Sequence, residues 1–308
     1  MANGEARPLS PADQVIRALR HEPVRPLPRG ELFVGSNLLD RLFPEAEGNL
    51  PRQLERLVST FELSLIGVDL ENERIRSLAS KEAFHGLEGY FLVGTLNGPV
   101  SRLIEREGFF KGMVDFVQKG GSFVKVSQRF LHDVRRVVQE VSSHLIRAIA
   151  VTDDIAGSQG LFFSPGDFNA NLRPLYREAV AIVREAGLFS FFHSDGDIRE
   201  IVHDLIEDGF DCLHPVDAQA GQNLYELAKA FGDRLCFMGH IDIVAWSKAQ
   251  IEEEVDRAER SFARGGLILG SSCGLSIETL SEGLGGLYPG WKRWARQVTE
   301  MAWKRGRS

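Results

Sequence analysis

The sequence predicts one α/β domain built as a closed (β/α)8 barrel of the TIM type, preceded by a short helical segment. Eight short apolar runs recur along the 308 residues, and most are separated by amphipathic helical patterns with charged outer faces. Near-continuous apolar strands that alternate with such helices indicate a parallel sheet covered by helices. Eight such units in a chain of this length suggest a closed barrel. An open doubly wound sheet is the alternative, but its glycine fingerprint is missing.

The first expected element is a capped helix, "SPADQVIRAL", at residues 10–19. It belongs to an N-terminal helical segment, 1–30, which we expect to cover one end of the barrel formed by 31–308. The expected strands are 31–35, 63–69, 90–95, 147–153, 188–194, 211–216, 234–240 and 266–272. The clearest helical patterns cover 172–187, 198–209, 224–232 and 250–265.

Charge and composition exclude several classes of function. The net charge is −7, and only the C-terminal tail after residue 290 is basic, so nucleic acid is not an expected partner. Three cysteines without a secretory leader indicate a reducing, cytoplasmic setting. No apolar run reaches the roughly 20 residues that a membrane-spanning helix needs.

Polar side chains stand where seven of the expected strands end. Catalytic groups gather at the carboxyl ends of barrel strands, so these positions are candidates for one site. A single histidine at a strand end is more often a hydrogen-bonded structural group, but seven such ends together predict a site. The residues are Asp69, Asn97, Asp153, Asp154, His193, Asp195, His214, His240, Asp242 and Cys273.

The stretch "FSFFHSDGDIREIV" (189–202) suggests a metal site within this set. His193 and Asp195 are two residues apart, so both can face the barrel mouth if the chain stays extended. Histidine, aspartate and cysteine can bind zinc together, and a catalytic zinc needs three protein ligands. Asp197 and Glu200 match a helix capping box, which frees Asp195 from a capping role. The Gly-rich turn "GSSCG" (270–274) could bring Cys273 to the metal or could instead cradle a phosphate.

Several motifs resemble those of the uroporphyrinogen decarboxylase superfamily along almost the whole chain. They are "SPADQVIRALRHEPVRPLP", "LIGVDL", "VTDDIAGSQGLFFSPGDF", "FFHSDGDI", "DGFDCLHPV", "FGDRLCFMGHID" and "LILGSSCG". The resemblance implies a (β/α)8 barrel, in agreement with the strand count. It also implies one of two activities, because the superfamily contains metal-free decarboxylases and corrinoid-dependent methyltransferases.

The decarboxylase branch holds its anionic tetrapyrrole with arginines near the first strand. Here the corresponding stretch "PLPRGELFVGSNLL" carries Glu31 and only Arg29, and Asp69 alone aligns with the catalytic aspartate of that branch. The methyltransferase branch binds zinc through H-x-C and a distant cysteine. His193 and Cys273 match this pattern, whereas Asp195 stands where the first cysteine is expected. The resemblance therefore implies zinc, or another divalent metal, on His193, Asp195 and Cys273.

The implied function is metal-dependent methyl transfer between a small substrate and the cobalt of a corrinoid. The substrate would be a methoxy, methylamine or thiol compound. No D-x-H-x-x-G cobalamin motif occurs in the chain, so the corrinoid is expected on a partner protein. Asp69, Asp153 and Asp154 are expected as acid, base or orienting groups, and Glu31, Asn97, His214 and His240 as substrate contacts. A tetrapyrrole decarboxylase and a metal-free binding barrel stay open as alternatives, and so does the oligomeric state, with a homodimer among the options.

Overall fold

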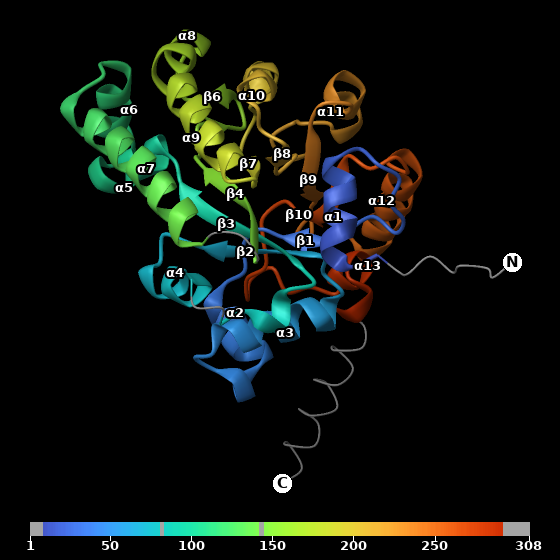
Figure 1. The fold of residues 1–308 in the computed structure, drawn as a ribbon. Coiled ribbons are helices and arrows are strands. Elements are labelled where there is room, and N and C mark those ends of the chain that lie inside the picture. The colour runs from blue at the N-terminus through green and yellow to red at the C-terminus, as the bar shows by residue number, and fades with distance from the viewer. Residues whose placement is uncertain (1–8, 81–82, 142–144, 292–308) are drawn as a thin grey trace, which may run out of the picture.

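The computed structural model describes residues 9–80, 83–141 and 145–291 and contains the predicted barrel (Figure 1). Eight strands form one sheet in the order β1-β2-β3-β4-β7-β8-β9-β10, and each pair of neighbours is parallel. Their bounds are Gly30–Glu31, Leu65–Asp69, Phe91–Asn97, Ile146–Thr152, Phe189–His193, Cys212–His214, Cys236–Ile241 and Leu267–Ser271. The fold class and seven of the predicted strands are confirmed, whereas the first, expected at 31–35, is only the two-residue strand Gly30–Glu31 with an isolated bridge at Val34.

The barrel closes between β10 and the residues around the short strand β1. Parallel bridges pair Arg29 with Leu269 and Val34 with Leu275. A side chain at Gly270 would place its Cβ 2.3 Å from the carbonyl oxygen of Gly30. Glycine at this position therefore allows the two edge strands to approach closely.

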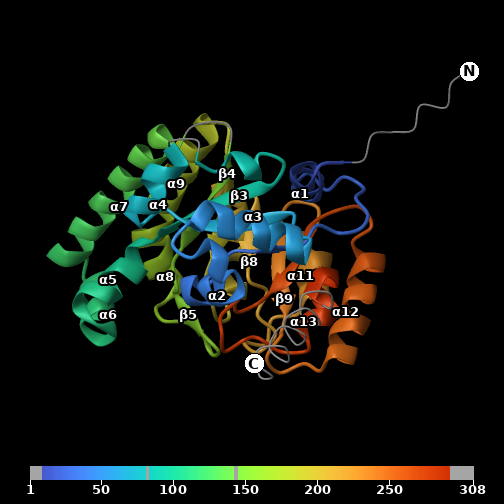
Figure 2. The ribbon, with the colours of Figure 1, turned by 90° about the horizontal axis from the view of Figure 1, so that it is seen from below.

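Helices surround the strands on the outside (Figures 1 and 2). The helices are α1 Pro11–Leu19, α2 Ser36–Leu42, α3 Leu50–Phe61, α4 Glu73–Ser80, α5 Pro99–Glu107, α6 Phe109–Val117, α7 Gly121–Glu140, α8 Pro165–Asp167, α9 Arg173–Glu185, α10 Val202–Asp208, α11 Leu224–Phe231, α12 Lys248–Ser261 and α13 Leu284–Leu287. Three predicted helices correspond to α9, α11 and α12. The fourth, 198–209, begins as a 3-10 turn at Arg199–Ile201 and continues as α10.

Helix α1 lies at the amino-terminal ends of the strands. The Ser10 side chain accepts a hydrogen bond from the Asp13 amide and caps the helix, as the sequence predicted. The amide of Gly266, just before β10, donates to the Ala18 carbonyl at 2.8 Å. The Ala12 amide donates to the carbonyl of Gly89, shortly before β3, at 2.9 Å. These contacts place α1 at the end of the barrel opposite the mouth.

Alternation along β7 determines which of its side chains point into the barrel. Phe191 reaches Phe91 of β3 across the intervening strand β4, with ring centroids 6.2 Å apart, so it points inward. Phe192 packs on Tyr176 of the outer helix α9, so it points outward. Because strand side chains alternate, His193 points inward at the carboxyl end of β7.

No helix in the described ranges is long and apolar enough to cross a membrane. The basic C-terminal tail noted in the sequence lies outside the described residues from 292 onward.

Candidate functional site

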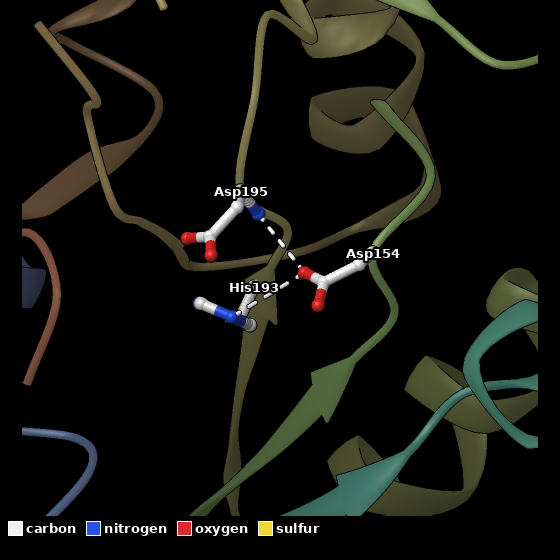
Figure 3. Close-up of side chains that lie close together, drawn as sticks. All are labelled: Asp154, His193 and Asp195. Atoms are coloured by element: carbon white, nitrogen blue, oxygen red, sulfur yellow. Dashed lines mark hydrogen bonds and ion pairs between the residues drawn. The ribbon is translucent and has the colours of Figure 1, made fainter. Parts of the chain in front are cut away.

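Three potential metal ligands converge at the mouth of the barrel. One ligand atom each from Asp154, His193 and Asp195 lies within 4.8 Å of the other two (Figure 3). Oδ1 of Asp154 accepts a hydrogen bond from the Asp195 amide at 3.0 Å and lies 3.6 Å from Nε2 of His193. His193 ends β7, and Asp154 follows the neighbouring strand β4. Two residues predicted as ligands, His193 and Asp195, are therefore brought together, and Asp154 is the third member of this candidate set, called the ligand group below.

Gly196 allows the loop after Asp195 to pack against the loop after Asp154. Its φ is +85°, and a Cβ there would lie 2.6 Å from the main chain of Ala156. The next amide, of Asp197, donates to the Gly157 carbonyl at 2.9 Å. Ala156–Gly157 is strand β5 of a small hairpin with β6, Gly160–Leu161. The two loops that carry Asp154 and Asp195 are thus held together by their backbones.

The imidazole of His193 is fixed on its other side by a second histidine. Its Nδ1 lies 2.8 Å from Nδ1 of His214, the last residue of β8. The ring of Phe33 packs edge-on against both imidazoles, at centroid distances of 4.7 and 6.0 Å. Burial lowers the pKa of His193 to about 4 and that of His214 well below its ordinary value. Both rings are therefore neutral near pH 7, and neutral imidazole is the form that binds metal.

The carboxyl groups at the mouth repel one another. Burial, together with the nearby charges of Asp154 and Asp217, raises the pKa of Asp195 to about 6. A divalent cation between these groups would relieve the repulsion and favour the ionised carboxylates. The donor set, one neutral imidazole and two carboxylates, therefore fits a divalent metal such as zinc.

Cys273 is not part of this three-residue group among the residues that the structure describes. It lies exposed in the turn after β10. Although the residue is exposed, its sulfur is partly buried, and this burial together with the charges of Glu31, Asp242 and Asp195 raises the pKa of the thiol to about 11. Partial burial and the negative charges around the barrel mouth therefore keep the Cys273 sulfur as a neutral thiol near pH 7.

The sequence also suggested that the turn at 270–274 could cradle a phosphate, but the structure does not favour this alternative. The Ser271 amide donates to Glu31 at 2.9 Å, and the Ser272 amide donates to the Ile241 carbonyl at 3.0 Å. A cradle needs free amide groups that point at the anion. Because two amides of the turn already have protein acceptors, we do not assign a phosphate site here.

Asp153, expected as an acid, base or orienting group, holds the start of helix α5. Its carboxylate accepts from the amides of Val100 and Ser101, at 3.2 and 2.6 Å, and from the Tyr176 hydroxyl at 2.7 Å. The side chain is fully buried, and burial raises its pKa to about 6. A carboxylate at a helix N-terminus satisfies free amides and interacts favourably with the helix dipole.

Three other predicted site residues make hydrogen bonds or close contacts with other parts of the barrel. Asp69 is exposed at the end of β2 and accepts from the Glu71 amide. Asn97, at the end of β3, accepts from the Thr152 hydroxyl at 3.0 Å. The imidazole of His240 contacts Glu254 of the outer helix α12, with Nε2 and Oε1 3.1 Å apart.

The backbone of His240 accounts for its position. Its φ is +83°, in the left-handed region that residues other than glycine seldom adopt. The ring packs against Trp246 as well as Glu254. The regular alternation assumed at the end of this strand fails at this residue, and the structure therefore does not bring His240 to the ligand group.

The predicted capping box at Asp197 and Glu200 is wrong. The helical turn begins at Arg199, and its N-cap is Ile198, which makes no side-chain capping bond. Asp197 instead accepts from the Arg199 amide at 3.1 Å and pairs with the Arg199 guanidinium at 2.7 Å. The capping box does not form, because Asp197 pairs with Arg199 and the helical turn begins later than the motif requires. Asp195 does not cap the helix either.

Glu31, expected to contact substrate, ends the short strand β1 and lies fully buried against the end of β10. Its carboxylate accepts from the Ser271 amide at 2.9 Å, from the Ser271 hydroxyl at 2.8 Å and from the Tyr288 hydroxyl. These three donors connect the two edges of the barrel with the segment after α13. Burial raises the pKa of Glu31 from 4.5 to about 7.

This shift predicts a stability change with pH. The folded protein holds the Glu31 proton more tightly than the unfolded chain does. The resulting stabilisation is complete below pH 4.5 and is lost as the pH rises through about 7. We expect the unfolding free energy of the wild type, relative to Glu31→Gln, to fall by about 3 kcal/mol over this interval. Urea unfolding of both proteins from pH 4.5 to 8 measures it, and a constant difference would contradict the assignment.

Two residues beside the ligand group were not singled out from the sequence. Phe33 follows β1 and packs on both histidines, but a phenylalanine near a strand end gives no chemical signal. Asp217 follows His214 in "HPVD", much as Asp195 follows His193 in "HSD", and this parallel could have identified it.

The fold and the ligand group together define a (β/α)8 barrel with a polar site at the carboxyl ends of its strands. Residues 112–287 match the family model described as uroporphyrinogen decarboxylase (URO-D). The match covers more than half of the chain, and the protein belongs to the uroporphyrinogen decarboxylase family, as its motifs predicted. A comparison with curated protein sequences found no match.

Two solved structures have a similar fold. A methyltransferase from Methanosarcina mazei superposes with a TM-score of 0.65 and 15% sequence identity, over 94% of this chain and 100% of that chain. The mannanase BCman from Bacillus subtilis superposes with a TM-score of 0.54 and 13% identity, over 89% of this chain and 88% of that chain. At these identities the similarity concerns the fold alone.

Proposed function

We propose that the protein is a metal-dependent methyltransferase. It would move a methyl group between a small methoxy, methylamine or thiol compound and the cobalt of a corrinoid carried by a partner protein. The observation that carries the proposal is the convergence of Asp154, His193 and Asp195 at the mouth of a barrel of this family. The fold similarity to a methyltransferase from Methanosarcina mazei is consistent with it.

The residues of the site would have different roles in metal binding and orientation. His193 presents Nε2, and Asp154 and Asp195 present carboxylate oxygens, as the three protein ligands. A divalent metal there supplies Lewis-acid polarisation of the oxygen, nitrogen or sulfur atom of the substrate. Asp154 also accepts the Asp195 amide, which fixes the orientation of the loop. Asp153 would hold the start of α5 in place, in an orienting role.

In this proposal, Cys273 lies at the barrel mouth and contacts the substrate. Its neutral thiol shares the negative field of Asp195 and Asp242. A cation at the ligand group would favour the thiolate, so the sulfur would respond to metal loading even from outside the group. This role replaces the ligand role expected from the family pattern.

Tetrapyrrole decarboxylation is the second candidate, and the charge distribution disfavours it. The guanidinium of Arg29 donates to the Leu287 carbonyl at 2.9 Å and lies 3.8 Å from Glu259 of α12. The Arg29 side chain therefore makes these contacts outside the barrel. The mouth carries Asp154, Asp195 and further acidic groups, which would repel a substrate with several carboxylate arms.

The test is a methyl-transfer assay with the zinc-loaded protein. One arm offers methylcobalamin with a panel of thiols, and the other offers cob(I)alamin with methoxylated aromatics and methylamines. We expect a change in the cobalamin absorbance spectrum that requires the protein and disappears after chelation. Conversion of uroporphyrinogen to coproporphyrinogen would show that the decarboxylase alternative is correct, and no reaction in either arm would contradict methyl transfer.

A further inference from the structure

Gln222 connects the loop after β8 with the loop that carries Asp195. Its Nε2 donates a hydrogen bond of 2.7 Å to the carbonyl oxygen of Gly196, and the contact is buried. Gln222 is only 3% exposed, so water competes little for this bond. Gly196 directly follows Asp195, and the bond therefore acts on the main chain one residue from a candidate ligand.

Only one orientation of the Gln222 amide fits this contact. A carbonyl oxygen accepts hydrogen bonds and cannot donate them, so the NH2 end of the amide must face Gly196. The other end, Oε1, is buried without a hydrogen-bond partner among the residues that the structure describes. An apolar side chain would fill the same space without the cost of an unpaired oxygen. The bond to Gly196, rather than packing, therefore accounts for a glutamine at this position.

The peptide that joins Gly196 to Asp197 is held at both of its polar ends. The Gly196 carbonyl accepts from Gln222, and the Asp197 amide donates to the Gly157 carbonyl at 2.9 Å. Gly157 follows β4 and Gln222 follows β8, which are the two neighbours of β7 in the sheet. The φ of Gly196 is +85°, and glycine has more backbone freedom than any other residue. The two bonds therefore restrict a peptide that could otherwise rotate.

The loop after β8 gives Gln222 a fixed base. The Gln222 amide donates to the Asp217 carbonyl at 3.1 Å. The next residue, Asn223, caps α11, because its side chain accepts from two amides in the first turn of that helix. The Gln222 side chain thus extends from the start of a helix, and its length sets the separation between this loop and Gly196.

The bonds around Asp195 lie on both sides of it along the chain. Before it, the Ser194 amide donates to the His214 carbonyl at 3.2 Å, and the Ser194 hydroxyl donates to the Asp195 carbonyl at 2.9 Å. The Asp195 amide itself donates to Asp154 at 3.0 Å. The bond from Gln222 follows directly after Asp195. The direction of the Asp195 carboxylate therefore depends on both sets of bonds.

We propose that Gln222 is a positioning residue that directs Asp195 toward Asp154 and His193 by holding the Gly196 carbonyl. Its effect on metal binding rests on the proposed function, in which Asp195 is a ligand. Partners that orient a metal ligand typically contribute 10–100-fold to metal affinity, so loss of the bond should lower zinc affinity by about 10–100-fold. The hydrogen bond itself belongs to the metal-free protein and is tested separately.

The contact is tested by NMR of the metal-free protein, labelled with 13C at the glycine carbonyls and with 15N at aspartate. A correlation between the two labels selects Gly-Asp peptides, and the sequence contains three, at 166–167, 196–197 and 232–233. The signal that disappears in Asp197→Asn belongs to the peptide after Gly196. Its carbon shift reports the hydrogen bond to the Gly196 carbonyl, and its amide exchange reports the freedom of Asp197.

Gln222→Met keeps the length of the side chain and removes the donor. We expect an upfield carbon shift at Gly196, faster exchange of the Asp197 amide and the stated loss of zinc affinity. The melting temperature should change little, because losing the bond and removing the unpaired oxygen have opposite effects. Gln222→Leu removes the donor with a different shape and should behave in the same way.

Gln219→Met is the matched control from the same loop. Gln219 also donates through Nε2, but to Asp242 after β9, at 2.6 Å. The variant therefore removes a similar bond on the side of the loop away from Gly196. It should change neither the Gly196 carbon shift nor the exchange of the Asp197 amide.

Zinc affinity is measured by competition with a chromophoric chelator, and thermal melting checks that each variant folds. An unchanged Gly196 signal in folded Gln222→Met would overturn the hydrogen bond, and unchanged zinc affinity after its loss would overturn the positioning role. If neither Gln222 variant folds, the side chain is structural and the proposal is likewise overturned. If the wild type binds no zinc while the signals respond as expected, the anchoring of Gly196 is supported and the proposed metal-dependent function fails.

Discussion

Asp195→Ala is expected to reduce zinc affinity by about 100-fold or more while the barrel stays folded. Loss of a direct ligand should cost at least as much as loss of an outer partner, for which 10–100-fold is typical. Burial raises the pKa of Asp195, and the charges of Asp154 and Asp217 act in the same direction, so removal of this carboxylate relieves repulsion and should not destabilise the fold. Asp195→Cys should keep or tighten zinc, because thiolate is a softer ligand.

Asp154 and Cys273 distinguish the group seen in the structure from the set expected from the family pattern. Asp154→Ala should lose zinc to the same degree as Asp195→Ala, whereas Cys273→Ala should retain it. Asp69→Ala is the matched control, since Asp69 is an exposed strand-end aspartate outside the group. Metal content by mass spectrometry and chelator competition measures all of these variants. Zinc loss in Cys273→Ala but not in Asp154→Ala would show that the family pattern is correct.

Asp153→Ala is expected to lower the free energy of unfolding by roughly 2–4 kcal/mol. Loss of a helix-capping acceptor costs about 0.5–2 kcal/mol, and a buried hydroxyl left without a partner costs about 1–3 kcal/mol. Both penalties apply, because Asp153 accepts from the first turn of α5 and from Tyr176, which is fully buried.

Urea unfolding at pH 8 measures this effect with the Asp153 carboxylate ionised. Tyr176→Phe serves as the control, because it removes only one of the three donors and should cost about 1 kcal/mol. A loss in Asp153→Ala no larger than that in Tyr176→Phe would show that the α5 amides gain little from the carboxylate. Zinc affinity should change in neither variant as long as the protein is folded.

Local sequence patterns were sufficient to predict the strands, the barrel and the polar strand ends. Apolar runs with helical patterns between them are short-range features, and burial on both faces of a parallel sheet requires them. Phe191 and His193 share one face of β7 because side chains alternate along any strand, so an inward histidine follows from the spacing. The family motifs then identified His193 and Asp195 as candidate ligands.

Local patterns failed where the backbone departs from regular geometry. The left-handed conformation of His240 directs its ring to Glu254 outside the barrel, and no propensity of histidine predicts it. At Asp197, the neighbouring Arg199 competes for the carboxylate and the helical turn begins later than the capping motif requires. In both cases a tertiary or ionic contact outweighs a weak local preference.

The sequence by itself determined that titratable groups end the strands, because each group is encoded beside its own apolar run. Only the tertiary structure decided which of these groups meet. Thr152 of β4 pairs in register with His193 of the adjacent strand β7, which places Asp154 beside Asp195. Cys273 follows β10, three strands further around the barrel from β7. Strand order and register depend on contacts between residues far apart in the chain, and these select Asp154 as the third member of the group.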